Sequence, residues 1–137
     1  MNFKIIDKIE KEDEEIIFQG LLEYNLSKIE DKNPKDLGVF LLNENGEKIA
    51  GLIGNTHGNW LSVKYLWVSK ELRGRNIGNH ILEQAERTAR TRGCKYVFLD
   101  TFSFQAPAFY KKYGYKEVLV LENYPVSGKR YYLTKIL

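Results

Sequence analysis

The sequence predicts a mixed α/β fold in one domain, with helices flanking a central, mostly antiparallel sheet of about seven strands. Apolar residues recur with helical spacing in two long segments, and they alternate or run continuously in about seven short ones. Turn residues separate the segments. A chain of 137 residues is close to the commonest domain size, so residues 1–137 should share one core. The expected order of elements is β α β β β α β α β β.

The N-terminal segment is expected to form a strand and then a helix. Phe3 and Ile5 alternate with polar residues over residues 2–7, which predicts a first strand. Over residues 12–30, apolar side chains recur every three to five positions, and acidic side chains gather in the first turn, where the helix dipole stabilises them. This pattern predicts the first helix, which Pro34 should end.

The next two apolar runs are predicted to pair as a β-hairpin. They cover residues 37–42 and 48–53, and Asn45-Gly46 between them is a strong hairpin signal. A second turn is expected over residues 54–59.

The centre of the chain is predicted to form a strand, a helix and a parallel strand. The first strand covers residues 60–69, and its alternation slips near its C-terminal end, which is typical of a bulge. The helix begins at Ile77 and stops at Gly93, and its charged residues, Glu86 among them, are expected off the apolar face. A continuous apolar run at residues 96–99 predicts the second strand of a right-handed crossover.

The C-terminal segment is expected to form a short helix and a closing hairpin. Helical spacing covers residues 105–113, and a glycine follows. Residues 115–121 and 130–136 are two further apolar runs, joined by a turn that contains proline and glycine.

Composition excludes several classes of protein. The net charge of +3 is too small, and the two signs too evenly interleaved, to predict a nucleic-acid binder. Cys94 is the only cysteine and His57 and His80 the only histidines, so neither an intrachain disulfide nor a metal site is predicted. No run approaches the roughly 20 apolar residues that cross a bilayer. We therefore expect a cytoplasmic protein that does not bind membranes.

The most informative segment leads from the strand at residues 60–69 into the second helix. It contains Arg73, Gly74, Arg75, Asn76, Ile77 and Gly78. A loop here points backbone N–H groups outward, and the helix behind it adds about half a positive charge, which together bind a phosphate. The two arginines add full charges, and asparagine tolerates a left-handed conformation. The sequence therefore predicts an anion site, most suitably for a diphosphate.

This segment resembles the acyl-CoA pyrophosphate loop of the GNAT superfamily of N-acetyltransferases. The family pattern is Arg or Gln, two variable residues, Gly, one variable residue, then Gly or Ala, and Asn76 replaces the first glycine. A second stretch is similar to the family's Ala-x-x-Leu-Tyr-x-Lys-x-Gly-Phe. It covers residues 106–115, from Ala106 to Tyr115. The expected order of elements agrees with the fold of this family.

The resemblance implies an acetyl-CoA site that needs no metal. In this family the strand before the loop offers backbone groups to pantetheine, and here these are Leu66, Trp67 and Val68. The pyrophosphate would bind to the loop, at Arg73, Gly74, Arg75, Asn76, Ile77, Gly78 and Asn79. The family places a general acid at the tyrosine of the second motif, which is Tyr110. A phenol with a pKa near 10 stays protonated at neutral pH and can donate to a leaving thiolate.

Several groups are candidates for the general base. An alkylammonium has a pKa of about 10.4, so its proton must be removed before the amine attacks. Many family members use a carboxylate on the strand at residues 60–69, but this strand has none, and Lys64 has the wrong charge. We favour Asp100 or a water molecule, with Glu23 and His57 as alternatives.

An acceptor pocket is expected between the first helix, the middle of the sheet and the segment after residue 99. Residues that could line it are Tyr24, Asn25, Trp60, Trp67, Phe102, Phe104 and Gln105. Aromatic walls with few acids favour an amine on a partly apolar or planar small molecule. Edge strands make a homodimer conceivable.

These observations predict an N-acetyltransferase that moves an acetyl group from acetyl-CoA to a primary amine of a small molecule or peptide. The amine would attack directly in a ternary complex, with Tyr110 as the general acid and no covalent enzyme intermediate. A non-catalytic acyl-CoA sensor is the alternative, because the strand lacks a carboxylate and Asn76 replaces a glycine. A small RNA-binding domain is a weaker one, because the chain lacks a basic patch.

Overall fold

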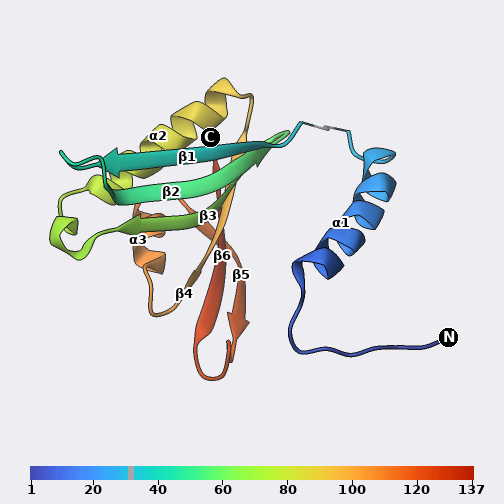
Figure 1. Cartoon of the computed structure of the whole chain (residues 1–137). Coiled ribbons are helices and arrows are strands. Elements are labelled where there is room, and N and C mark those ends of the chain that lie inside the picture. Colours follow the sequence, from blue (N-terminus) through green and yellow to red (C-terminus); the bar gives the residue numbers. More distant parts are fainter. Residues whose placement is uncertain (31–32) are drawn as a thin grey trace. The chain divides into compact units, whose positions relative to one another are not determined.

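The structure is a computed structural model, which describes residues 1–30 and 33–137 (Figure 1). The chain divides into two compact units, Met1–Lys32 and Asn33–Leu137. Each unit is described by itself below.

The N-terminal unit contains one helix, α1, which covers Lys11–Leu26. Acidic residues fill its first turn, as expected. The helix ends at Leu26 rather than near residue 30, and the next residue, Ser27, donates its hydroxyl hydrogen bond back to the Tyr24 carbonyl. The predicted strand at residues 2–7 was wrong. Phe3 and Ile5 are 88% and 92% exposed, and no strand of residues 1–30 is available to pair with them.

The second unit is built on one six-stranded sheet, in the order β1-β2-β3-β4-β6-β5 (Figure 1). The mixed α/β class is confirmed, with one strand fewer than predicted because the N-terminal strand does not form. The parallel pairing of β3 with β4 is also confirmed, and the other neighbours are antiparallel. The strands are β1 Lys35–Leu42, β2 Lys48–His57, β3 Trp60–Val68, β4 Tyr96–Phe102, β5 Lys116–Glu122 and β6 Lys129–Ile136.

The predicted hairpin is confirmed, but its second strand is longer than expected. The β1–β2 turn places Gly46 at φ 78°, and the Asn43 side chain accepts hydrogen bonds from the N–H groups of Asn45 and Glu47. The turn expected at residues 54–59 was wrong, because β2 continues to His57, opposite a bulge at Lys64 of β3. A Cβ at Gly54 would lie 2.3 Å from the carbonyl oxygen of the facing strand, so only glycine allows this approach.

The helix α2, Ile77–Thr91, packs against β1, β2 and β3. Alternate strand residues, such as Leu52, Leu61 and Leu99, bury their side chains in the core shared with this helix. The residues between them lie on the opposite face, which we call the open face of the sheet, where Phe40 and Ile53 are 45% and 46% exposed. Within residues 33–137, one face of the sheet is thus filled by the core shared with α2, and the other is not.

Two short helical segments connect the remaining strands. A 3-10 turn, η1, covers Lys70–Leu72, and α3 covers Pro107–Lys112, within the predicted range of residues 105–113. Within the described ranges, no helix is long and apolar enough to span a bilayer. The cytoplasmic location stays a prediction.

Candidate active site

The parallel strands β3 and β4 pair only as far as Val63 and Leu99, although both continue beyond these residues. A hollow of about 700 Å³ lies beside the parting strands, and we call it the tyrosine hollow. Its lining residues are Val63, Lys64, Tyr65, Leu66, Trp67, Arg73, Leu99, Asp100, Thr101, Phe104, Gln105, Ala106 and Tyr110. Its volume falls within the range of small-molecule sites.

A second hollow, of about 370 Å³, lies at the N-terminus of α2, and we call it the helix-mouth hollow. It shares Leu66, Arg73, Ala106 and Tyr110 with the tyrosine hollow. Its other lining residues are Val68, Leu72, Gly74, Asn76, Ile77, Gly78, Phe109, Lys112 and Tyr113. The two hollows therefore adjoin each other at Tyr110.

The loop before α2 has the conformation that an anion site needs. Gly74 has a φ of 81°, and Asn76 has a φ of 62° in the left-handed region. Asparagine tolerates this region better than most residues, so the replacement of the family's glycine preserves the turn. In the part of the chain that the structure describes, the N–H groups of residues 74–76 donate to no backbone carbonyl. These groups and the first N–H groups of α2 can bind an anion together.

The charged and polar side chains of this loop differ in how they are held. Arg73 lines both hollows, and its Nε donates to the Val68 carbonyl at 3.2 Å, which ties the loop to the end of β3. Arg75 is exposed and lines neither hollow. Asn79 donates to the Glu83 carboxylate at 3.3 Å. Arg73 is therefore the arginine best placed to reach a ligand in both hollows.

Tyr110 lines both hollows, and its surroundings change its pKa. It is 9% exposed, and the rings of Phe109 and Tyr115 pack edge-on against it, with centroids 5.2 Å and 5.7 Å away. Burial, and then the negative charge of Asp100, raises the pKa of Tyr110 to about 12. The phenol is therefore protonated at neutral pH and available as a proton donor.

A buried hydrogen-bond network lies behind Tyr110. Glu86 on α2 is only 3% exposed, and its carboxylate accepts hydrogen bonds from the Tyr115 hydroxyl and the Lys135 ammonium, both at 2.8 Å. Burial, and then the charge of Glu86, raises the pKa of Tyr115. The expectation that Glu86 lies off the apolar face was wrong. Its spacing of four residues from Leu82 and three from Ala89, both buried, was the signal that could have placed it in the core.

A second acid–base cluster lies at the edge of the tyrosine hollow. The Asp100 Oδ2 atom accepts a hydrogen bond from Arg130 Nε at 2.8 Å, and Arg130 also donates to the Tyr124 hydroxyl at 3.0 Å. The Arg130 guanidinium lies over the rings of Phe102, Tyr124 and Tyr132. The hydrogen bond to Asp100 is the main cause that raises the pKa of Arg130. This pair could not be predicted from local sequence patterns, because it depends on how β4 and β6 align.

The structure brings together some of the predicted acceptor residues and not others. Trp67, Phe104 and Gln105 line the tyrosine hollow, and Phe102 stacks on Phe104 beside it. Trp60 lines none of the hollows described here and instead packs on Tyr96 at the other end of β3.

The alternative bases, Glu23 and His57, and the remaining predicted acceptor residues do not line the tyrosine hollow. His57 ends β2, at the end of the hairpin away from the parting strands. Tyr24, Asn25 and Glu23 belong to α1, in the N-terminal unit, and their roles stay predictions. In residues 1–30 and 33–137, no three metal-ligating side chains group closely enough to hold a metal ion.

Comparisons with known proteins agree with this geometry. The model of the Acetyltransferase (GNAT) family matches residues 4–115. Acetyltransferase Atu2258 of Agrobacterium fabrum is 34% identical over 118 residues, 86% of each chain. Blasticidin-S acetyltransferase of Streptomyces morookaense is 35% identical over 100 residues, 72% of this chain and 74% of that protein.

A solved structure extends the comparison to the fold. The crystal structure of an acetyltransferase from Agrobacterium tumefaciens superposes on this chain with a TM-score of 0.95. The two chains are 31% identical, and the superposition covers 100% of each. The family match spans both the loop before α2 and the segment that carries Tyr110. The chain therefore belongs to the GNAT family of acetyltransferases.

Proposed function

We propose that the protein transfers the acetyl group of acetyl-CoA to a primary amine of a small molecule, by direct attack in a ternary complex. The observation that carries the proposal is the position of Tyr110, a protonated phenol where the two hollows adjoin. One hollow ends at the N–H groups of the loop before α2, and the other is large enough for an acceptor.

The donor would lie along the helix-mouth hollow. Its diphosphate would bind the N–H groups of residues 74–79 and the Arg73 guanidinium, because both supply positive charge at the mouth of α2. The backbone of Leu66 and Trp67 has no β4 partner, so it can form hydrogen bonds with the pantetheine amides. Val68 also lies beyond the pairing with β4, but its carbonyl already accepts a hydrogen bond from Arg73, which leaves its second lone pair for the ligand. This arrangement would direct the thioester toward Tyr110.

The chemical step needs one proton donor and one proton acceptor. The neutral amine nitrogen attacks the thioester carbonyl carbon, a C–N bond forms and the C–S bond breaks. Tyr110 gives its proton to the leaving sulfur. The proton that the nitrogen loses as the amide forms returns to Tyr110, directly or through solvent, so the products are an amide and the free thiol. Holding both reactants beside Tyr110 would supply much of the rate enhancement.

The proton of the incoming ammonium would go to Asp100, directly or through a water molecule. Asp100 lines the tyrosine hollow, and its negative charge contributes to the raised pKa of Tyr110. Arg130 fixes the orientation of this carboxylate through Oδ2. The same carboxylate would attract a cationic amine toward the reacting atoms.

The acceptor is proposed to be a small molecule. The relative from Streptomyces morookaense is named for blasticidin S, which makes this compound a suitable first probe. The pocket adds aromatic surface from Trp67 and Phe104. A homodimer stays a prediction, which the mass of the protein in solution would test.

The proposal is tested by measuring thiol release from acetyl-CoA with a panel of amines that includes blasticidin S. Tyr110→Phe should lower turnover about 100-fold, because general acid catalysis contributes at least that factor. Tyr96→Phe is the control, since it removes a phenol that lines none of the hollows described here. Wild-type turnover by Tyr110→Phe, with chemistry rate-limiting, would rule out Tyr110 as the acid. Binding of coenzyme A without amine-dependent thiol release would indicate a sensor instead.

A further inference from the structure

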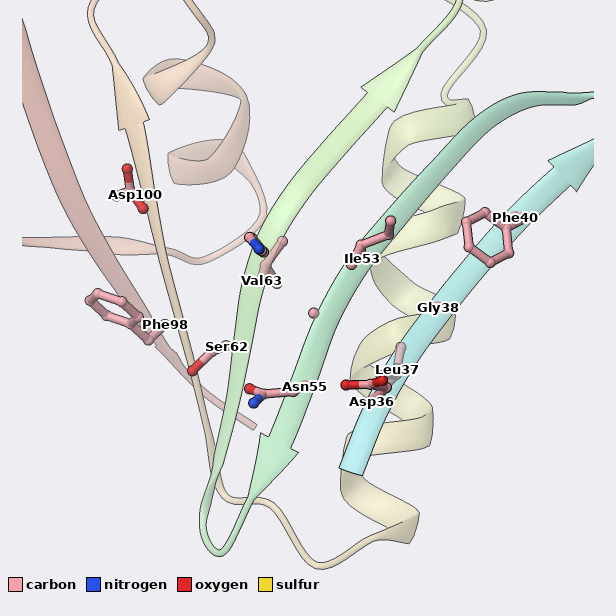
Figure 2. A pocket seen from close by; sticks show the side chains of 12 residues that line it. Asp36, Leu37, Gly38, Phe40, Ile53, Asn55, Ser62, Val63, Phe98 and Asp100 are labelled. Atoms are coloured by element: carbon pink, nitrogen blue, oxygen red, sulfur yellow. The ribbon is translucent and has the colours of Figure 1, made fainter. Parts of the chain in front are cut away.

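A third hollow, of about 700 Å³, lies on the open face of the sheet, and we call it the sheet hollow (Figure 2). It shares Val63, Lys64 and Asp100 with the tyrosine hollow. Because the two hollows adjoin at these residues, a molecule whose reacting amine lies beside Tyr110 can extend across the sheet.

Glycines and one aromatic ring give the sheet hollow an apolar floor. A Cβ at Gly38 on β1 would lie 2.8 Å from the Phe40 ring, and a Cβ at Gly51 on β2 would also lie 2.8 Å from it. The ring therefore lies along the sheet over two positions that have no side chain. Ile53 and Phe98 add apolar surface, so the hollow can hold a methylene chain or a planar ring.

A row of polar side chains crosses this floor. Asp36 on β1 faces Asn55 on β2, and Asn55 faces Ser62 on β3. Figure 2 shows the three side chains in line across the strands, with Asp100 farther along β4. Asp36 and Asp100 therefore mark the two ends of the sheet hollow.

The charges at the two ends are held differently. Arg130 pairs with Asp100, whereas the Asp36 carboxylate has no ion-pair partner among residues 33–137. Arg92 Nη1 donates at 3.0 Å to the backbone carbonyl of Asp36 instead. Lys64, the cation that lines the hollow, lies over the Tyr65 ring with its nitrogen 5.3 Å from the ring centroid. The Asp36 end thus presents an unpaired negative charge, which attracts a cation.

We propose that the sheet hollow binds the part of the acceptor that is not acetylated, and that Asp36 selects elongated acceptors with a second cationic group. This inference rests on the proposed function, which places the reacting amine beside Tyr110. The backbones of Asp36 and Asp100 are separated by three strand spacings across the sheet and by two residues along β4. Because these two steps are perpendicular, the direct distance is about 16 Å. Long diamines and polyamines match this distance, whereas a monoamine lacks the group that Asp36 would bind.

The test compares straight-chain diamines of increasing length with monoamines of the same length. Turnover is followed by thiol release from acetyl-CoA, and binding of each amine to the coenzyme A complex is followed by calorimetry. Asp36→Asn removes the charge and keeps the shape of the side chain. Glu44→Gln is the matched control, because it removes an exposed carboxylate from the β1–β2 turn, outside the sheet hollow.

The longest diamines should be the best substrates, and Asp36→Asn should raise their KM and Kd about fivefold, the value of an exposed ion pair. Their kcat, the constants for monoamines and the behaviour of Glu44→Gln should not change. Equal constants for diamines and monoamines, or an Asp36→Asn variant that matches the wild type, would overturn the inference while turnover still supported the proposed function. Diamine binding that depends on Asp36 without any turnover would support the inference and contradict the proposed function. Absence of both would overturn both.

Discussion

Two carboxylates near Tyr110, one beside its neighbour Tyr115 and one at the edge of the tyrosine hollow, have different surroundings. Glu86 is almost fully buried and accepts hydrogen bonds from Tyr115 and Lys135, whereas the side chain of Asp100 is 27% exposed and pairs with Arg130 at the edge of the tyrosine hollow. A buried charge must keep all its partners, because water cannot replace them. A carboxylate at the edge of a hollow can exchange partners with a ligand. We therefore expect Glu86 to act on stability and propose that Asp100 acts in the reaction.

Removing the buried hydrogen-bond network around Glu86 should change the free energy of unfolding most. Glu86→Ala should lower the free energy of unfolding by about 3 kcal/mol, because it leaves the Tyr115 hydroxyl and the Lys135 ammonium without their acceptor. Urea unfolding followed by circular dichroism measures it. Glu83→Ala, at an exposed position on the same helix, is the control and should cost under about 0.5 kcal/mol. Equal effects of the two substitutions would show that burial does not distinguish Glu86.

Alkaline unfolding should show the next largest effect. The pKa of Tyr110 is about 12 in the folded chain and near 10 when unfolded. A raised folded-state pKa stabilises the fold fully below about pH 10, and this contribution is lost as the pH rises toward 12. Tyr110 should therefore contribute about 2–3 kcal/mol to the free energy of unfolding, and this contribution disappears over this window.

The variant Tyr110→Phe isolates that contribution from the other tyrosines. Its free energy of unfolding should fall less steeply than that of the wild type between about pH 10 and pH 12. The pKa of Tyr115 is raised mainly by burial and by Glu86, which both proteins keep, and only to a smaller extent by Tyr110. Parallel curves would mean that Tyr110 is not protected in the folded state.

The smallest effect on stability is expected at Asp100. Asp100→Asn should lower the free energy of unfolding by less than about 1 kcal/mol, because the pair with Arg130 is partly exposed. The pH profile of kcat/KM should change instead. If Asp100 takes the amine's proton, kcat/KM of the wild type levels off at a pH below the pKa of the acceptor amine. In the variant, kcat/KM keeps rising with pH up to that pKa. Superimposable profiles would remove Asp100 from the proton path.

Local patterns allowed much of the fold and the conformation of the loop before α2 to be predicted. The Asn45-Gly46 turn, the switch to helical spacing at Ile77 and the left-handed Asn76 each depend on a few neighbouring residues. The position of Tyr110 came from a motif, and the structure places this residue beside both hollows.

What could not be predicted depends on contacts between distant segments. The Asp100–Arg130 pair joins residues 30 positions apart, through the register of β4 with β6. The row from Asp36 to Ser62 likewise requires three strands to align. The false strand at residues 2–7 shows the converse, since alternation alone does not provide a partner strand.

The proposed function requires the loop before α2 to bind the diphosphate of the donor beside Tyr110. Calorimetric titration with coenzyme A and with pantetheine, which lacks the diphosphate, measures this binding. We expect coenzyme A to bind at least about 100-fold more tightly, and Arg73→Gln to remove about tenfold of that difference, as for a hydrogen-bonded charge pair. Equal affinities for the two ligands, or a difference that Arg73→Gln leaves intact, would contradict the account.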